Sequence, residues 1–420
     1  MNGIHSLGRL EPMQLDLPAT AEDDAGGTWK MERDSKGRLG LHCPQGLGFG
    51  RPIESQAMLV FLIALAVSLT VTLWMIRRSR ADGHRFHDHD LAGPQKFHAA
   101  PVPRVGGIGI FAGVLAGAAL QWFRFPDLGV PTLLLLACAL PAFGSGLTED
   151  LTKSQSPRRR LFFTAVSAAL AVVLLDAAIV RTAIPGLDWL VSMRIGAAMV
   201  TVFVVAGVAN SINIIDGFNG LASMCAVLIL GSIGYVAFQV GDGLIVALAA
   251  AGAGAVLGFF VWNFPSGLIF LGDGGAYFLG FYIAELAIML LYRNPAVSPM
   301  FPLLVCIYPV FETIFSIYRR VMLRDQPAGL PDGIHLHSLI YRRVMRWTVG
   351  KSSKRSQIRR NSMTSPYLWM LCMMAVVPSM LFWDSTPLLM SFIVLFGVVY
   401  TGLYWRIVRF KSPRWMITKR

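Results

Sequence analysis

The sequence predicts an all-α, polytopic integral membrane protein, and three observations carry that prediction. The chain has 420 residues, of which 55% are hydrophobic and only 15% are charged, and its mean hydropathy is +0.57. Apolar runs of about 17–20 residues recur, and at ~1.5 Å per residue such a run crosses a hydrocarbon core of ~30 Å. A soluble protein of this length would show amphipathic periodicity, whereas this chain shows continuous apolar runs.

About eleven of the apolar runs are expected to span the membrane as helices. The connections between them are short, so we expect no separate soluble domain among them. The expected spans are residues 58–76, 105–122, 130–147, 161–180, 195–209, 220–238, 244–262, 276–292, 299–318, 367–383 and 387–405.

Positive charge predicts how these spans are oriented. Lys and Arg gather in the connections that follow spans one, three and nine. The even-numbered connections hold only Arg124, Arg181, Arg194 and Arg293. The positive-inside rule therefore places the odd connections and the basic tail, residues 406–420, in the cytoplasm. The N-terminus is then outside, and the inner (cytoplasmic) membrane is the expected location.

Residues 1–57 differ from the transmembrane domain expected over residues 58–405. They are polar, Gly-rich and mixed in charge, and they lack the apolar core of a signal peptide. This composition favours disorder. A non-native start upstream of Met58 fits the same observations.

Polar residues break the apolar pattern after span five, in NSINIIDGFNGLA, residues 210–222. Asn210, Asn213 and Asp216 are three apart, so a helical turn would place them on one face. Two tight turns, at Asp216-Gly217 and at Asn219-Gly220, explain the same residues. The stretch therefore indicates either a site or a pair of turns.

Four further polar stretches occupy the other odd connections. Each has a plain structural reading: an N-cap for the Gly-rich stretch, a helix end for Glu149 and Asp150, surface histidines for His335 and His337, and a membrane anchor for Arg158–Arg160. All five stretches nevertheless fall on the predicted cytoplasmic side, which favours a common active site formed by these loops. The four are GPQKFHAAPVPRVGG (93–107), GLTEDLTKSQSPRRR (146–160), WNFPSGLIFLGDGGAYFLGF (262–281) and PDGIHLHSLIYRR (331–343).

The residue types in these loops indicate phosphoryl-group chemistry. Carboxylates and amides supply hard oxygen ligands, which suit Mg²⁺ or Mn²⁺, and no Cys/His set suits zinc. Carboxylates, a divalent cation and basic residues are what transfer of a phosphorylated group requires. A site at the membrane face implies that one substrate is a lipid.

The motifs resemble those of the polyprenyl-phosphate N-acetylhexosamine-1-phosphate transferases, glycosyltransferase family 4, which include phospho-N-acetylmuramoyl-pentapeptide transferase. NSINIIDGFNGLA is similar to the family's N-x-x-N-x-x-D-G-x-D-G-L-A, and FLGDGGAYFLGF to F-x-G-D-x-G-S-x-x-L-G. EDLTK resembles the D-D pair, while KFHAAPVPRVGG and PDGIHLHSLIYRR resemble the first-loop and histidine motifs. The match runs in order over residues 58–343.

The resemblance implies roles for individual residues. Asp273 would be the leading metal ligand, with Asp150 as a second. Glu149 and Asp150 would hold or deprotonate the lipid phosphate or share the metal, and Asp216 joins them in the catalytic set. The expected substrate contacts, to nucleotide, diphosphate, phosphate or sugar, are Lys96, Asn210, Asn213, Asn219, Asn263, Phe270, His335 and His337.

Four positions depart from the family pattern. Glu149 replaces the first Asp of the pair, Ala276 replaces a Ser, and Ser338 stands where a third His is usual. Asn219 replaces the second Asp of D-G-x-D-G, a position that the family associates with the nucleotide. We therefore expect a UDP-sugar donor that is bound somewhat more weakly.

The predicted function is transfer of an N-acetylhexosamine 1-phosphate from a UDP-sugar to polyprenyl (undecaprenyl) phosphate, releasing UMP. Such a step begins the synthesis of O-antigen lipopolysaccharide or another cell-wall or envelope glycan. No nucleic-acid partner is expected, and a homodimer is compatible with this reading. The alternative is a membrane transporter or lipid flippase, which Glu285 and Glu312 within the spans would suit. Transporters, however, place their polar groups near the bilayer midplane.

Overall fold

The computed structural model describes residues 20–22, 28–33, 39–42, 50–81, 102–124, 126–324, 334–345 and 353–409. The chain divides into two units, Met1–Pro52 and Ile53–Arg420. The first unit contains β1 (Thr20–Glu22), β2 (Thr28–Arg33) and β3 (Leu39–His42), which pair antiparallel in that order. This small sheet lies in the segment for which the sequence predicted disorder.

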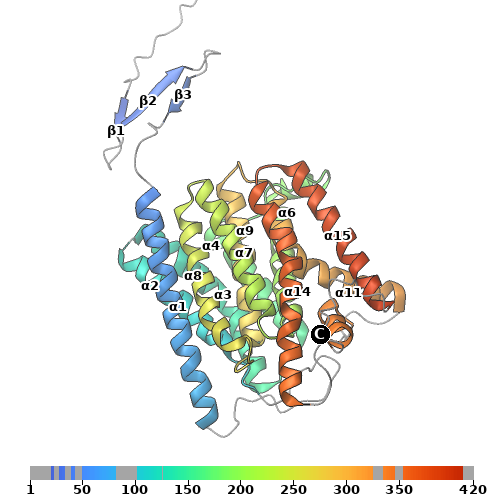
Figure 1. The fold of residues 1–420 in the computed structure, drawn as a ribbon. Helices are drawn as coiled ribbons and strands as arrows, with labels where there is room; N and C mark the ends of the chain where they lie inside the picture. The colour runs from blue at the N-terminus through green and yellow to red at the C-terminus, as the bar shows by residue number, and fades with distance from the viewer. Residues whose placement is uncertain are drawn as a thin grey trace, which may run out of the picture. The chain divides into compact units, whose positions relative to one another are not determined.

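The second unit is a bundle of helices (Figure 1). Its elements are α1 (Gly50–Ala81, which begins in the first unit), α2 (Gly106–Arg124), α3 (Pro126–Thr152), α4 (Pro157–Leu175), α5 (Leu187–Val191), α6 (Arg194–Ile215), α7 (Leu221–Gln239), α8 (Gly243–Asn263), α9 (Gly272–Arg293), α10 (Phe301–Val305), α11 (Ile307–Arg324), α12 (Leu336–Leu339), the π-helix η1 (Ile340–Val344), α14 (Lys354–Leu381) and α15 (Thr386–Val408). The all-α fold class is thereby confirmed.

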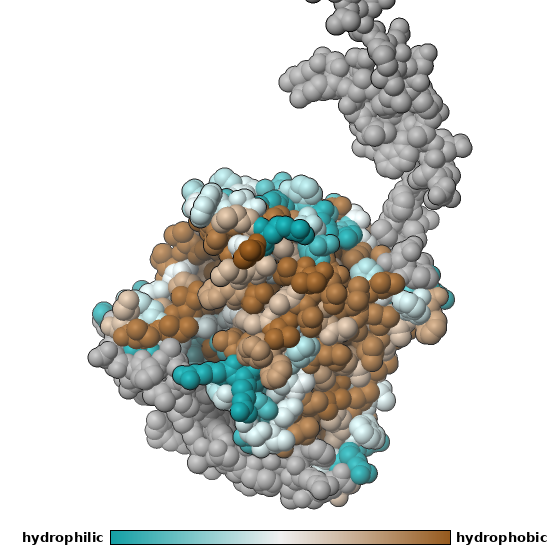
Figure 2. Space-filling model, turned by 180° about the vertical axis from the view of Figure 1, so that it is seen from behind, coloured by the Kyte–Doolittle hydropathy of each residue, from teal (hydrophilic) through white to brown (hydrophobic). Residues whose placement is uncertain are grey.

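Nine of the described helices are long and apolar enough to cross a membrane. They are α1, α2, α3, α6, α7, α8, α9, α14 and α15. Hydrophobic residues cover most of the bundle's visible surface in Figure 2, while hydrophilic residues gather toward its ends. Large side chains on that surface include Phe203, which is 79% exposed, and Ile195, which is 77% exposed. The protein is a multi-pass membrane protein.

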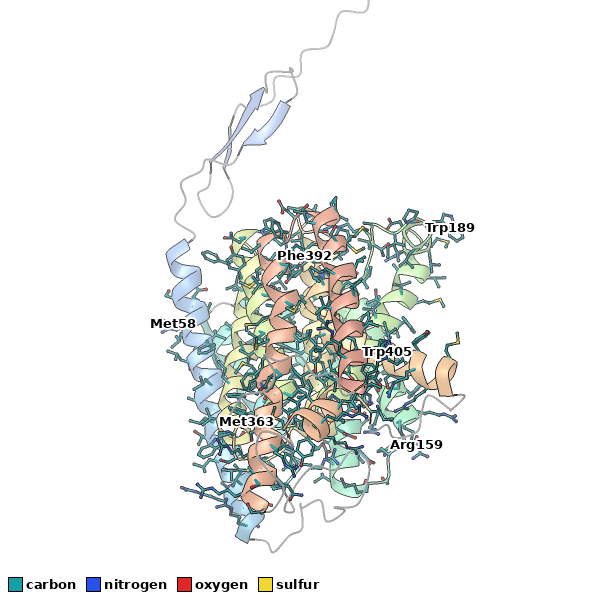
Figure 3. All side chains as sticks on the ribbon, turned by 45° about the vertical axis from the view of Figure 1, so that its right-hand side comes forward. Met58, Arg159, Trp189, Met363, Phe392 and Trp405 are labelled. Carbon is teal, nitrogen blue, oxygen red and sulfur yellow. The ribbon has the colours of Figure 1, made fainter. Side chains whose placement is uncertain are left out.

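The two remaining predicted spans correspond to α4 and to the pair α10 and α11. Helix α4 carries the three arginines Arg158–Arg160 in its first turn. The predicted ninth span is not one continuous helix, because it is interrupted at Cys306. Pro309 has no N–H to donate to the carbonyl of Val305, which accounts for the break. Helix α11 then runs at a steep angle to its neighbours (Figures 1 and 3), and a total of eleven spans stays a prediction.

Helix α9 is the centre of the bundle, and every residue from Gly272 to Leu291 is buried. Glycines allow three neighbouring backbones to approach it closely. A Cβ atom on Gly107 of α2 would lie 2.4 Å from the Cα of Gly275, and one on Gly280 would lie 2.4 Å from the Cα of Ala209 in α6. A Cβ on Gly146 of α3 would lie 2.6 Å from the carbonyl carbon of Asp273. Small residues pack membrane helices in this way.

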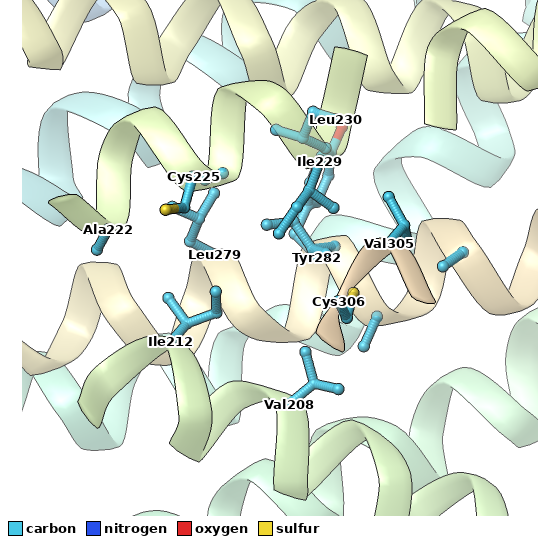
Figure 4. Close-up of a cluster of buried hydrophobic side chains, with 14 of the residues drawn as sticks. Val208, Ile212, Ala222, Cys225, Ile229, Leu230, Leu279, Tyr282, Val305 and Cys306 are labelled. Carbon is cyan, nitrogen blue, oxygen red and sulfur yellow. The ribbon is translucent and has the colours of Figure 1, made fainter. Parts of the chain in front are cut away.

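The middle of the bundle is apolar where α6, α7 and α9 meet (Figure 4). Ile212 of α6 and Ile229 of α7 are each 0% exposed there, as are Leu279 and Tyr282 of α9. Tyr282 satisfies its hydroxyl by donating to the carbonyl of Leu248 at 2.8 Å. This core holds the first turn of α9 at one end of the bundle, the end at which Figure 3 labels Arg159 and Met363.

Candidate active site

The carboxylate of Asp273 is the point at which four helices or their flanking segments meet. Asp273 lies in the first turn of α9 and is 7% exposed. Its Oδ1 accepts from Asn213 Nδ2 of α6 at 3.0 Å and from Arg104 Nη2, just before α2, at 3.4 Å. Its Oδ2 forms an ion pair with Arg160 of α4. A carboxylate at a helix N-terminus is also stabilised by the helix dipole.

Asp150 of α3 caps the same helix end. Its Oδ1 accepts from the backbone N–H of Asp273 at 2.9 Å, and its Oδ2 accepts from that of Gly274 at 2.8 Å. Gly272 makes this approach feasible, because its φ is +76° and a Cβ there would lie 2.6 Å from Asp150 Oδ2. Two carboxylates therefore lie at the start of α9, one from α3 and one from α9 itself.

The polar residues at the end of α6 share one face, as their spacing predicted. Asn213 donates to Asp273, and Asn210 Oδ1 accepts from the hydroxyl of Tyr277 in α9 at 3.4 Å. Asp216, which follows the last residue of α6, accepts a backbone hydrogen bond from Gly272. All three side chains therefore face the first turns of α9.

The charge state of Asp216 is sensitive to pH near neutrality. Burial raises the pKa of this carboxyl to about 7, although the positive charge of Arg104 and the hydrogen bond from Gly272 favour the ionised form. Below that pH the group is protonated and neutral, and above it the carboxylate forms. Asp216 therefore changes charge within the range in which enzymes are assayed.

The histidines of the motif PDGIHLHSLIYRR stack on each other next to the loop that ends α6. His335 and His337 are each 4% exposed, and their ring centroids are 5.0 Å apart with an interplanar angle of 13°. His337 meets the ring of Phe218 edge-on at 5.4 Å. Because Phe218 follows Asp216 by two residues, the histidine motif lies next to the loop that ends α6.

Three other predicted site residues are placed differently. Glu149 Oε2 accepts from the backbone N–H of Gln155 at 2.6 Å, which ties the end of α3 to the connection before α4. Phe270 pairs through its backbone, donating to the carbonyl of Pro103 at 2.9 Å and accepting from Gly106 at 3.0 Å. Lys96 lies outside the described residues.

Two predicted site asparagines have their side chains engaged by the protein itself. Asn263 Oδ1 accepts from Gly220 N–H at 2.6 Å, and its Nδ2 donates to the carbonyl of Ile269 at 2.8 Å. Asn219 is 3% exposed, and its Nδ2 donates to the carbonyl of Pro265 at 3.0 Å. Its backbone carbonyl accepts from Ser365 of α14 at 2.6 Å. This packing favours a structural role for Asn219 over the predicted nucleotide contact.

Comparison with known proteins identifies the family of this chain. The family model described as glycosyl transferase family 4 matches residues 132–291, which run from α3 to α9. A phospho-N-acetylmuramoyl-pentapeptide-transferase of Mycobacterium marinum is 30% identical over 275 residues, which cover 56% of this chain and 76% of that protein. The chain belongs to glycosyl transferase family 4.

Two further relatives agree with this membership. A probable undecaprenyl-phosphate N-acetylglucosaminyl 1-phosphate transferase of Bacillus subtilis is 29% identical over 287 residues, covering 67% of this chain and 77% of the relative. A decaprenyl-phosphate N-acetylglucosaminephosphotransferase of Mycolicibacterium smegmatis is 25% identical over 386 residues, covering 84% and 89%. Like these relatives, this family 4 member is an enzyme, a phosphotransferase of sugar phosphates.

Sequence reasoning missed two residues of the candidate site, Arg104 and Arg160. Both had been counted only as positive charges that orient the membrane spans. The structure brings both guanidinium groups to Asp273, and Arg160 also lies over the ring of Tyr277, 5.7 Å from its centroid. A signal was available for Arg160, because the third of three consecutive arginines on a helix points in a different direction from the two before it.

The donor set of the candidate site suits a hard divalent cation held by few protein ligands. Among the described residues no group of three or more His, Cys, Asp or Glu side chains is gathered as a metal cluster. Mg²⁺ typically takes one or two protein carboxylates and completes its coordination with water and substrate phosphates. Asp273 and Asp150 offer two adjacent carboxyl groups, so these residues fit such an ion.

Activity of this family 4 enzyme is expected to fall as the pH drops through about 7, if Asp216 must be ionised. The pKa of Asp216 is raised, so protonation removes its charge below that pH. The check is a pH profile of kcat/KM between pH 5.5 and 9. The residual activity of Asp216→Asn should lack this acidic limb, and a wild-type profile that is flat down to pH 5.5 would contradict the assignment.

Asn219→Asp is expected to destabilise the enzyme rather than improve donor binding. A carboxylate cannot donate to the carbonyl of Pro265, and a buried polar group left without its partner costs about 1–3 kcal/mol. The melting temperature in detergent should therefore fall. Ser362→Ala is the control, because Ser362 contacts the same side chain at 3.3 Å but contributes only its hydroxyl. An unchanged melting temperature together with a lower donor KM would support the predicted contact between residue 219 and the nucleotide.

Proposed function

We propose that the enzyme transfers an N-acetylhexosamine 1-phosphate from a UDP-sugar to a polyprenyl phosphate and releases UMP. The relative from Bacillus subtilis is named for undecaprenyl phosphate and N-acetylglucosaminyl 1-phosphate transfer, and the relative from Mycolicibacterium smegmatis is named a decaprenyl-phosphate N-acetylglucosaminephosphotransferase. The five motifs of the sequence lead to the same reaction. The product would be the first lipid-linked intermediate of an envelope polysaccharide or O-antigen.

One observation supports this proposal most strongly, the convergence on Asp273. Two guanidinium groups and an amide donor surround one carboxylate at the N-terminus of a buried helix. Arginine forks and helix N-termini are the groups that proteins use to bind phosphates. The same place therefore offers both an anion site and carboxylates for a cation, which a sugar diphosphate bound with a metal requires.

In the proposed reaction an oxygen of the polyprenyl phosphate attacks the phosphorus atom attached to the sugar. The bond from that phosphorus to the oxygen of the uridine phosphate breaks, so the products are a polyprenyl-diphosphate sugar and UMP. Arg104 and Arg160 would offset the negative charge of the donor diphosphate, and Asn213 would orient it. Asp273 and Asp150 would hold Mg²⁺ or Mn²⁺, which supplies further charge neutralisation.

The remaining assignments follow from the position of each residue. Asp216 lies beside the α9 terminus, and His337 lies beside the loop that ends α6. Asp216 and the two histidines would contact phosphate or sugar. Glu149 would contact the acceptor phosphate, the role that the resemblance implies for it. We place the site at the cytoplasmic face of the inner membrane, because Arg158–Arg160 begin α4 at the same end of the bundle as the first turn of α9. A homodimer stays a prediction.

A transporter or flippase is not favoured by the arrangement of polar groups. The described site residues gather at the end of α3, the end of α6 and the start of α9, and not at the middle of the bundle. Glu285 is buried within α9, but neither of its carboxyl oxygens has a hydrogen-bond partner in the described part of the chain. A substrate path across a membrane needs a series of polar groups, and one carboxyl does not provide it.

The test is release of UMP by the purified protein in detergent. The assay contains undecaprenyl phosphate, Mg²⁺ and each member of a panel of UDP-N-acetylhexosamines. We expect one donor to release UMP and to form a lipid-linked sugar diphosphate, and we expect EDTA to abolish both and added Mg²⁺ or Mn²⁺ to restore them. A preparation of Asp273→Asn controls for contaminating enzymes. No UMP with any donor would contradict the reaction, and full turnover in EDTA would contradict the metal.

A further inference from the structure

Glu312 is a buried acidic residue that none of the site contacts described above involves. It lies in α11 and is 1% exposed. Its Oε1 lies 3.1 Å from Nδ1 of His335 and accepts from the backbone N–H of Leu336 at 2.9 Å. A single carboxylate oxygen thus holds both the ring of the first motif histidine and the chain that leads to the second.

This contact fixes the state of the His335 ring. An ionised carboxylate can only accept hydrogen bonds, so Nδ1 of His335 must carry the proton. In neutral His335 the proton then sits on Nδ1, and Nε2 is left as an acceptor. In the charged form Nε2 becomes a donor, and the glutamate stabilises the positive charge. Second-layer carboxylates orient and tune histidines in this way in many enzymes.

The orientation of His335 affects its neighbours through direct contacts. His337 stacks on His335 with ring centroids 5.0 Å apart, so rotation of one ring would displace the other. Nε2 of His337 would lie 3.7 Å from a Cβ placed on Gly217. Gly217 directly follows Asp216, whose carboxyl faces the start of α9. Contacts therefore connect Glu312 with the α6 loop of the candidate site.

The other end of the histidine motif is held independently. Arg343 Nη1 donates to the carbonyl of Ile407 at 2.8 Å and to that of Val408, at the end of α15. The backbone N–H of Leu339 donates to the carbonyl of His335 at 2.9 Å. Glu312 therefore anchors the beginning of the motif, and Arg343 anchors its end.

The titratable groups that face Glu312 come from three parts of the chain. His335 and His337 approach it from the histidine motif, Tyr308 from its own helix α11, and Tyr400 from α15. The second oxygen, Oε2, has no hydrogen-bond partner among the described residues. Both contacts of Oε1, with His335 and with the backbone of Leu336, therefore go to the histidine motif.

We propose that Glu312 is a positioning residue, which sets the tautomer and orientation of His335 and, through the ring stack, places His337 against the loop that ends α6. The expected effects on kcat rest on the proposed function. The contact between Glu312 and His335 does not depend on which substrates the enzyme uses. Glu312 itself touches no reacting atom.

The first test is the isosteric variant Glu312→Gln. Its amide oxygen still accepts from Leu336, so the backbone stays held, while the charge that favours a protonated Nδ1 is lost. We expect kcat to fall about 10- to 100-fold, the range for loss of such a supporting carboxylate, with donor KM changed less than about threefold. Glu285→Gln is the matched control, since Glu285 is equally buried but lies in α9. Its kcat should stay within about twofold of the wild type.

A double-mutant cycle separates a role through His335 from general stabilisation. If Glu312 acts through His335, Glu312→Gln should have no further effect on kcat in a His335→Ala background. Effects that multiply, or a Glu312→Gln enzyme with wild-type kcat and melting temperature, would overturn the proposal. Should Glu312→Gln fail to fold, Glu312→Asp, which keeps the charge, serves in the same cycle.

A spectroscopic readout keeps this proposal distinct from the proposed reaction. In protein labelled with ¹⁵N-histidine, the His335 signals, assigned by their loss in His335→Ala, should report a protonated, hydrogen-bonded Nδ1. Glu312→Gln should remove that signature. An unchanged His335 spectrum would overturn the positioning role even if UMP release is confirmed. The predicted spectrum together with no UMP release would contradict only the reaction.

Discussion

Asp273→Asn is expected to reduce kcat/KM on the order of 10²- to 10³-fold or more, with membrane insertion unchanged. The substitution keeps the size of the side chain but removes the charge that holds Arg104 and Arg160. It also turns an acceptor into a donor that faces two guanidinium groups. Loss of a preorganised electrostatic group of this kind costs about 2.7–4 kcal/mol of transition-state stabilisation. UMP release per mole of purified variant measures the effect.

Asp242→Asn is the matched control for this loss. Asp242 is also a buried carboxylate paired with an arginine, since it accepts from Arg293 Nε at 2.7 Å and caps the start of α8. It contacts none of the groups around Asp273. We expect its variant to lose thermal stability but to keep a turnover number within about threefold of the wild type. Equal losses in both variants would mean that Asp273 matters for folding and not for the reaction.

The sequence predicted the helices well because their signal is strong and local. A run of about 20 apolar residues has few alternatives to a membrane-spanning helix, and nine described helices satisfy that criterion. The predicted span over residues 299–318 is less regular. The break at Cys306 depends on Pro309, whose effect on a helix depends on whether neighbouring groups replace the lost hydrogen bond. The angle of α11 depends on packing between helices, which no periodicity encodes.

The candidate site was predictable as a set of loops but not as a set of contacts. The spacing of Asn210, Asn213 and Asp216 placed them on one face, and the structure shows that this face meets α9. Spacing does not reveal whether a side chain faces a substrate or the protein. Asn219 and Asn263 illustrate the limit, because their side-chain amides donate to carbonyls of the 263–269 segment, and that of Asn219 also donates to Ser362 of α14.

Arg160 is the opposite case, a residue that was not predicted for the site but contacts Asp273. Three consecutive arginines look alike in a count of positive charge, yet successive residues of a helix point about 100° apart. One of them can therefore face the bundle while the other two face solvent or lipid head groups. The side chain of Arg160 is only 12% exposed, whereas Arg158 and Arg159 are exposed residues. Figure 3 shows the place of Arg159 at this end of the bundle.

Arg160→Ala is therefore expected to lower kcat/KM on the order of 10²-fold or more, while Arg158→Ala and Arg159→Ala stay within about threefold of the wild type. Removing Arg160 leaves the Asp273 carboxylate without one of its cationic partners and takes away positive charge that would offset the donor diphosphate. Arg160→Lys should recover only part of the loss, because an ammonium group cannot present two parallel donors to a carboxylate or a phosphate.

The three alanine variants remove the same charge within one turn of α4, so they differ only in the direction of the side chain. A membrane-anchoring role predicts equal and small effects, which would appear in insertion or expression and not in turnover. An active-site role predicts that only Arg160 affects turnover. UMP release at saturating acceptor, normalised to the amount of folded protein in detergent, decides between them. Similar activities for all three variants would assign Arg160 to the anchor and leave Asp273 with Arg104 as its only functional cation.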